Sequence, residues 1–144
     1  MIIGIFKNRV YGYSSSFENT DYHYLNGIVG DGGIYSTVGD VFKWDQGLYN
    51  AGLVKKSTMA EALTPYTLND GSTAGDYGFG WRLDRGAKRD VIEHSGSWAG
   101  FRNWFRRDLK NQNAIIILSN NNREREVEEI KLAIDKILLG KSSE

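Results

Sequence analysis

Apolar residues recur at helical spacing in two segments of the chain. In the first segment they are Val38, Val41, Trp44 and Leu48. This spacing predicts a helix with one apolar face. Thr37, with Asp40 three residues later, resembles a capping box, so we expect the helix to begin there and Asp40 to act only as a cap. Gly52 is the expected left-handed stop.

The second periodic segment lies near the end of the sequence. Its apolar stripe consists of Val127, Ile130, Ile134, Ile137 and Leu138. We expect Asn121 or Asn122 to cap this helix, glutamates to occupy its first turns and Gly140 to end it. Two heptads are too few to argue for a coiled coil, so the stripe is expected to pack across a sheet.

Between these helices, turn residues separate short apolar runs. A short helix is predicted over residues 58–63, with Glu61 three residues after Thr58 and Pro65 as its end. A polar loop follows over residues 68–75, with a turn at Asn69-Asp70-Gly71-Ser72. The first thirty residues show little periodicity and are expected to be extended or looped, with a short strand at residues 9–13.

The alternating and apolar runs predict strands at residues 78–83, 91–94, 101–107 and 114–119. Their expected separators are Asp84-Arg85-Gly86, Ser95-Gly96-Ser97 and residues 108–113. These separators are too short for a parallel crossover, which indicates antiparallel pairing. The last run is uninterrupted by polar residues, so that strand should be covered on both faces. The predicted fold class is α+β, with a mostly antiparallel sheet and flanking helices.

Size and composition restrict the function classes. The 144 residues, 40% of them apolar, are enough for one domain with a core, and residues 1–144 are expected to form one. A net charge of zero argues against nucleic acid as a partner and against attraction to an anionic membrane. The sequence has no cysteine, and His23 and His94 stand apart, so neither a disulfide nor a metal or other cofactor is expected. Residues 1–6 are apolar but too few to span a membrane.

Two clusters allow a functional or a structural interpretation. Arg102, Arg106 and Arg107 have acidic neighbours, which favours a solvated strand over a phosphate site. An aromatic set near the start allows a sugar-binding or peptide-binding surface, but packing within a loop region is the favoured interpretation. Its members are Tyr11, Tyr13, Tyr22, His23 and Tyr24.

Four motifs stand in a recognisable order. They are Gly32-Gly33 with Ser36, Thr37, Asp40 and Trp44; Tyr77-Gly78-Phe79-Gly80-Trp81; His94-Ser95-Gly96; and Ile115-Ile116-Ile117-Leu118-Ser119-Asn120. In this order they resemble the serine β-lactamase and penicillin-binding protein family, in which Lys-Thr-Gly is the commoner form of the third motif. The resemblance covers nearly the whole chain and implies the later half of that family's fold.

The resemblance implies that His94, Ser95 and Gly96 form one wall of the family's active site. His94 would present a donor toward the nucleophile, and the Ser95 hydroxyl would bind an oxyanion or carboxylate. Gly96 would leave room for a substrate lying along the strand. Taken alone, the same string is equally consistent with a Ser/Gly turn and a structural histidine.

Residues after this motif are candidate substrate contacts: Ser97, Trp98 and Arg102. For Trp98, packing in the core or at the rim is as well supported as substrate contact. An arginine can pair with a substrate carboxylate in bidentate fashion, but a surface salt bridge is the favoured role of Arg102. Glu93 should alternate to the opposite face of the strand and is not a catalytic candidate.

The family's nucleophile is missing from this sequence. Members attack with the serine of a Ser-x-x-Lys motif, and no serine here is followed three residues later by lysine. Tyr24-Leu25-Asn26 matches the family's Tyr-x-Asn element but lies directly before Gly32-Gly33, so we interpret it as coincidental. Lys7 to Tyr13 resembles a stretch that follows the family's helical lobe, so Met1 is expected to lie inside a domain. Export is implied by the resemblance alone.

Three hypotheses follow. The chain is the C-terminal part of a serine hydrolase that cleaves an amide, β-lactam or ester, and is inactive alone. Alternatively, it is a non-catalytic module that binds peptides or peptidoglycan-like ligands, including β-lactam-like small molecules. Thirdly, it is an interaction half that forms a homo-oligomer, or joins its missing N-terminal half, through an open sheet.

Overall fold

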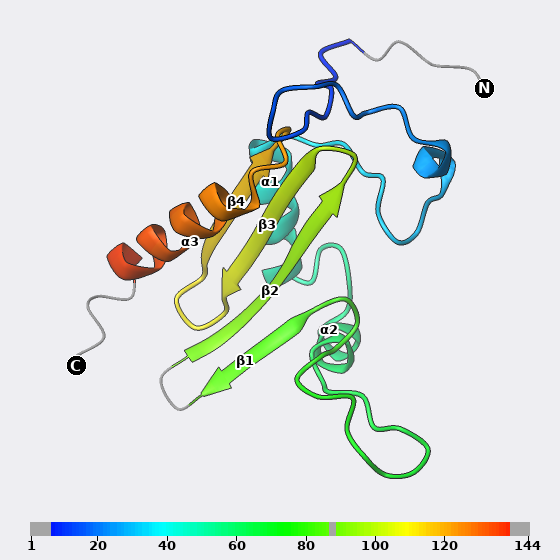
Figure 1. Cartoon of the computed structure of the whole chain (residues 1–144). Helices are drawn as coiled ribbons and strands as arrows, with labels where there is room; N and C mark the ends of the chain where they lie inside the picture. Colours follow the sequence, from blue (N-terminus) through cyan, green and yellow to red (C-terminus); the bar gives the residue numbers. More distant parts are fainter. Residues whose placement is uncertain (1–6, 87–88, 139–144) are drawn as a thin grey trace. The chain divides into compact units, whose positions relative to one another are not determined.

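The computed structural model of the chain describes residues 7–86 and 89–138. Its elements, in chain order, are the 3-10 helix η1 (Tyr24–Gly27), α1 (Val38–Tyr49), α2 (Lys56–Ala62), β1 (Arg82–Gly86), β2 (Arg89–Trp98), β3 (Phe101–Asp108), β4 (Asn113–Ser119) and α3 (Glu124–Leu138) (Figure 1). The chain divides into two compact units. One comprises residues 1–36, 96–103 and 118–144, and the other comprises residues 37–95 and 104–117.

The four strands form one antiparallel sheet in the order β1-β2-β3-β4 (Figure 1). The predicted α+β class is confirmed. β2 continues through Ser95-Gly96-Ser97, so the expected break there was wrong. The chain reverses instead at Ala99 and Gly100, whose φ angles of 42° and 85° suit a two-residue hairpin turn.

The first strand also differs from the prediction. Asp84-Arg85-Gly86 belongs to β1 rather than to a turn, and residues 78–81 form a turn rather than a strand. Glycine explains this turn at two positions. Gly80 has a φ of +74°, and a Cβ on Gly78 would lie 2.1 Å from the carbonyl oxygen of Ala62. The tight approach of residue 78 to the end of α2 therefore fixes where β1 begins.

The start of α1 is as predicted, but its end is not. Thr37 is the N-cap, and its hydroxyl accepts a hydrogen bond from the Asp40 backbone N–H at 3.1 Å. The helix stops at Tyr49, and Ala51 takes the left-handed conformation, with a φ of 53°, that was expected of Gly52. The stop is therefore one residue earlier and uses a residue with a side chain.

The second helix and its following loop agree with the pattern only in part. α2 begins at Lys56, and its N-cap Lys55 makes no side-chain capping bond, so the expected start at Thr58 was wrong. The loop is as predicted, because Gly71 has a φ of +84° and the Ser72 N–H donates to Asp70 Oδ1 at 2.9 Å.

The unit of residues 37–95 and 104–117 holds the apolar core. Leu63, Trp81, Leu83 and Ile92 are buried together, with Met59, Phe105 and Leu109 packed against them. On α1 the buried residues are Asp45 and Leu48, while Val38 and Trp44 are half exposed. The expected apolar face is thus interrupted by a charged residue, because Asp45 meets the buried Arg107 of β3.

The unit of residues 1–36, 96–103 and 118–144 is held mainly by loop contacts. The predicted strand over residues 9–13 is reduced to Tyr13, which bridges Asn19 and Asn121. Close packing requires glycine twice, since a Cβ on Gly12 would lie 1.9 Å from the Ala99 carbonyl oxygen and one on Gly100 would lie 2.3 Å from the Tyr13 nitrogen. The loop over residues 9–20 therefore packs closely against the β2–β3 turn.

The last strand and helix are less buried than predicted. In β4 only Ile115 is buried, and Leu118 is 40% exposed, so both faces are not covered. α3 has no buried residue, and Ile137 is 78% exposed. The Arg123 carbonyl accepts the first helical bond, so Asn121 and Asn122 precede the cap, and the expected stop at Gly140 lies outside the described residues. No helix among the described residues is long and apolar enough to cross a membrane.

Candidate functional site

The His94–Trp98 part of β2 has one open edge. β1 pairs with β2 from Gly86 opposite Arg89 to Arg82 opposite Glu93, and the pairing stops there. Within residues 7–86 and 89–138, no strand continues along residues 94–98 on that side. The backbone groups of an unpaired strand edge are available to an added extended segment.

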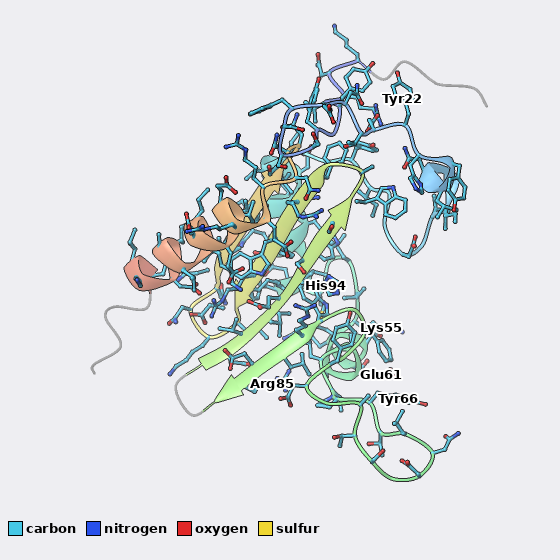
Figure 2. All side chains as sticks on the ribbon, viewed as in Figure 1. Tyr22, Lys55, Glu61, Tyr66, Arg85 and His94 are labelled. Carbon is cyan, nitrogen blue, oxygen red and sulfur yellow. The ribbon has the colours of Figure 1, made fainter. Side chains whose placement is uncertain are left out.

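His94 lies on β2 and is half buried (Figure 2). Its Nε2 is 2.8 Å from the Tyr77 hydroxyl, and its Nδ1 is 2.6 Å from the Ser95 carbonyl oxygen. Both ring nitrogens therefore have a protein partner. That His94 presents a donor to a nucleophile stays a prediction.

Ser95 and Gly96 are exposed on the strand. A Cβ at Gly96 would meet only Asn103, at 3.7 Å from its Cβ, which is an ordinary contact. The φ of Gly96 is outside the positive range that favours glycine. Packing and conformation within the described residues thus do not require glycine at position 96, in contrast to Gly12, Gly78 and Gly100.

Ser97 and Arg102 lie on either side of the β2–β3 turn and contact each other. One guanidinium nitrogen of Arg102 donates to the Ser97 hydroxyl and, at 3.0 Å, to the Phe101 carbonyl oxygen. Its Nε is buried with no hydrogen-bond partner among the described residues. The acceptors are a hydroxyl and a carbonyl, so the favoured salt bridge is not what holds this arginine.

Trp98 is 47% exposed and is oriented by a loop residue that the sequence did not indicate. Its indole Nε1 donates to the Asn26 side-chain oxygen at 2.7 Å, and its ring forms a T-shaped contact with His23 at 4.8 Å between centroids. Asn26 belongs to Tyr24-Leu25-Asn26, which forms η1. This short helix therefore supports Trp98.

The other candidate clusters separate in the structure. Tyr22 is 67% exposed, so the expectation that the aromatic set packs within a loop was wrong for this residue, whereas Tyr24, although 85% exposed, stacks on His23 at 4.7 Å between ring centroids (Figure 2 labels Tyr22). Arg106 and Arg107 are buried rather than solvated, and they face Glu93 and Asp45, respectively. The Glu93 side chain is therefore engaged in an ion pair.

Comparison with known proteins then decides the family. The family model described as Beta-lactamase matches residues 6–139. The chain belongs to the beta-lactamase family. It is also 36% identical over 136 residues to penicillin-binding protein 4* of Bacillus subtilis (strain 168), covering 92% of this chain and 30% of the relative. The chain thus spans less than a third of the length of that relative.

The family resemblance recognised from the four motifs is confirmed, and so is the predicted α+β fold of this part of the family's domain. The roles of His94, Ser95 and Gly96, and of Ser97, Trp98 and Arg102, stay predictions. Tyr77 and Asn26 are the contacts that sequence reasoning missed, although both stood inside motifs that it quoted. Among the described residues, no three of His, Cys, Asp and Glu gather as a metal site would need.

Proposed function

We propose that this chain forms the substrate-binding strand wall of a serine hydrolase of the β-lactamase and penicillin-binding class. In the complete enzyme a serine supplied from outside this sequence would attack an amide, β-lactam or ester carbonyl. The acyl-enzyme formed by that attack would then be hydrolysed. A backbone N–H on this wall would contribute to stabilising the oxyanion.

The open edge at residues 94–98 is the observation that carries this proposal. An extended ligand can add to such an edge through main-chain hydrogen bonds. Gly96 also supports the proposal. Packing among the described residues does not require glycine at this position, whereas a ligand backbone that approaches the strand closely would require one. The name of the Bacillus subtilis relative states that it binds penicillin, which fits the same ligand class.

We further propose that the chain alone binds such ligands without hydrolysing them. No serine of the sequence stands three residues before a lysine, so the family's activated nucleophile is missing. The test is the intact mass of the purified chain after incubation with a fluorophosphonate and, separately, with a penicillin. We expect no adduct with either reagent. A stoichiometric adduct would show that one of its own serines is activated and would overturn this part.

Binding is tested by thermal unfolding with and without a peptide that ends in D-Ala-D-Ala, since a ligand selective for the folded state raises its stability. Gly96→Val should unfold normally but lose the shift, because a side chain at position 96 would crowd a ligand lying along the strand. Gly86→Val is the matched control, since Gly86 is also an open strand glycine, with nothing within 4 Å of its Cβ position. No shift for the wild-type chain at high ligand concentration would contradict the binding proposal.

A second candidate function is self-association, which two observations favour. β4 is the last strand in the order of the sheet, and α3 exposes Ile130, Ile137 and Leu138. A second copy of the chain would cover these groups. Light scattering should then give a mass above 16.2 kDa, and Ile137→Glu should lower it. A monomer in the wild-type protein would exclude this candidate.

A further inference from the structure

Tyr77 and His94 lie together within the unit of residues 37–95 and 104–117. The Tyr77 hydroxyl oxygen is 2.8 Å from His94 Nε2, and the ring centroids are 6.0 Å apart at an interplanar angle of 67°. The proposed function places His94 on the open edge of β2 but gives Tyr77 no role. The question is what this contact does to the imidazole.

The other ring nitrogen decides where the proton sits. His94 Nδ1 lies 2.6 Å from the Ser95 carbonyl oxygen, which only accepts hydrogen bonds. Nδ1 must therefore carry a hydrogen, because a bare nitrogen there would place two lone pairs against each other. A neutral imidazole has one N–H, so Nε2 is bare and accepts from the Tyr77 hydroxyl.

We propose that Tyr77 is a positioning residue that holds His94 in the Nδ1–H tautomer. In this state a neutral His94 has no N–H left for a bound molecule, because one nitrogen donates to Ser95 and the other accepts from Tyr77. A ligand that needs a donor at Nε2 would have to displace the tyrosine hydroxyl, and Nε2, which is bare in this tautomer, would also have to gain a proton. This consequence for ligand choice rests on the proposed function, whereas the tautomer itself does not.

The backbone around Tyr77 is fixed well enough for such a role. Gly78 approaches the Ala62 carbonyl so closely that a Cβ would lie 2.1 Å from its oxygen. The Gly78 N–H donates to the Trp81 carbonyl oxygen at 2.8 Å, and Tyr77 forms an isolated bridge with Arg82. The turn that carries Tyr77 is thus tied both to α2 and to β1.

The second histidine of the sequence is a built-in reference. His23 Nδ1 accepts a hydrogen bond from the Leu25 backbone N–H at 3.2 Å. An accepting Nδ1 is bare, so a neutral His23 carries its proton on Nε2. The two histidines are therefore expected to occupy opposite tautomers.

The experiment is a long-range ¹H–¹⁵N NMR spectrum of the chain with ¹⁵N-labelled histidine, recorded at about pH 9, well above the reference imidazole pKa of about 6.5. The N–H and bare nitrogens of a neutral ring are well separated in ¹⁵N frequency, so each tautomer is seen directly. We expect Nδ1–H for His94 and Nε2–H for His23. Tyr77→Phe should lower the Nδ1–H to Nε2–H ratio of His94 by about 2- to 10-fold, the size of one neutral hydrogen bond.

Tyr66→Phe is the matched control, because Tyr66 is 58% exposed and lies in the loop after α2 (Figure 2). It should leave the tautomers of both histidines unchanged. Predominant Nε2–H at His94, or an unchanged His94 ratio in Tyr77→Phe, would overturn the proposal.

If Tyr77→Phe does not fold, the wild-type chain still tests the contact. An Overhauser contact between the Tyr77 ring protons next to its hydroxyl and the His94 ring supports the proposal, and its absence contradicts it. Because no ligand is used, failure of penicillin or peptide binding leaves this result unaffected, and a wrong tautomer leaves the binding result unaffected.

Discussion

The two compact units each contain an arginine–aspartate pair, and the pairs differ in burial. In the unit with most of the sheet, Arg107 Nε is 2.5 Å from Asp45 Oδ1, and both side chains are at most 2% exposed. In the other unit, Arg9 Nη2 is 2.5 Å from Asp21 Oδ2, but the Arg9 side chain is 22% exposed. The contact distance is therefore the same, and the surroundings differ.

The surroundings decide what each pair contributes. Arg107 also donates to the Asp45 carbonyl at 3.3 Å and lies over the Tyr49 ring at 4.6 Å, so protein groups surround the buried guanidinium. A buried pair gains strong attraction but has lost hydration, and its net contribution is small while both partners are present. In the other pair Asp21 is 4% exposed but the Arg9 side chain keeps part of its hydration, so removing Asp21 leaves a guanidinium that water can reach. Burial therefore increases the stability lost on removing one partner more than it increases the net stabilisation by the intact pair.

The largest expected effect comes from breaking the buried pair on one side. Arg107→Met leaves the Asp45 carboxylate, which is 0% exposed, without its cationic partner, while the Gln46 amide still donates to it at 2.8 Å. We expect a loss of about 3–5 kcal/mol in the free energy of unfolding. Urea unfolding with an unchanged slope would measure it. A loss below about 1 kcal/mol would show that Asp45 finds water or another donor.

Removing both charges of the buried pair separates the cost of a lone buried charge from the contribution of the intact pair. Asp45→Leu combined with Arg107→Met leaves no uncompensated charge, so the double variant should lose clearly less stability than Arg107→Met alone. The same urea measurement gives the coupling between the two sites. Simple addition of the losses of Arg107→Met and Asp45→Leu would mean that the two sites are not coupled, which would contradict a direct charge pair.

The part-exposed pair should respond less. Desolvation lowers the pKa of Arg9, but hydrogen bonds to Asp21 and Tyr35 outweigh it and hold the pKa above its ordinary value. Asp21→Asn removes the charge and keeps an acceptor, and we expect a loss of about 1.5–3 kcal/mol, the size of a charge-assisted hydrogen bond. Urea unfolding at low and high salt would measure it. A loss as large as that of Arg107→Met would remove the distinction between the two units.

The sequence predicted the contacts between residues that are close together along the chain. The cap at Thr37 and the turn at Asp70-Gly71-Ser72 were predicted because their partners are two or three residues away. Asp45 was missed because its partner is 62 residues away along the chain. The spacing of residues within a helix does not predict that a charged residue will lie on its buried face.

The candidate site divides in the same way. His94-Ser95-Gly96 was recognised from its residue types. Ser95 and Gly96 were predicted to form a turn because both residue types favour turns, but the chain reverses three residues later, at Ala99-Gly100. The Tyr77–His94 contact joins residues 17 positions apart through the turn after α2. That turn exists because Gly78 approaches the backbone of Ala62, which a single sequence does not reveal.

The smallest effect belongs to a third ion pair, at the start of α1. Lys43 Nζ is 3.0 Å from Asp40 Oδ1, and both side chains are more than half exposed. The hydrogen bond from Lys43, together with that of Thr37, holds the pKa of Asp40 below its usual value of 3.8. Because the folded-state pKa is the lower one, this stabilisation is present above 3.8 and is lost as the pH falls through the folded-state pKa.

Lys43→Met should therefore raise the pKa of Asp40 toward 3.8 while leaving the urea midpoint at neutral pH almost unchanged, as expected for an exposed pair. An NMR titration of the Asp40 carboxyl carbon measures the first, and urea unfolding measures the second. Lys56→Met is a suitable control, since Lys56 begins α2 instead. If Lys43→Met shifted the midpoint as far as Asp21→Asn does, burial would not be what ranks the three pairs.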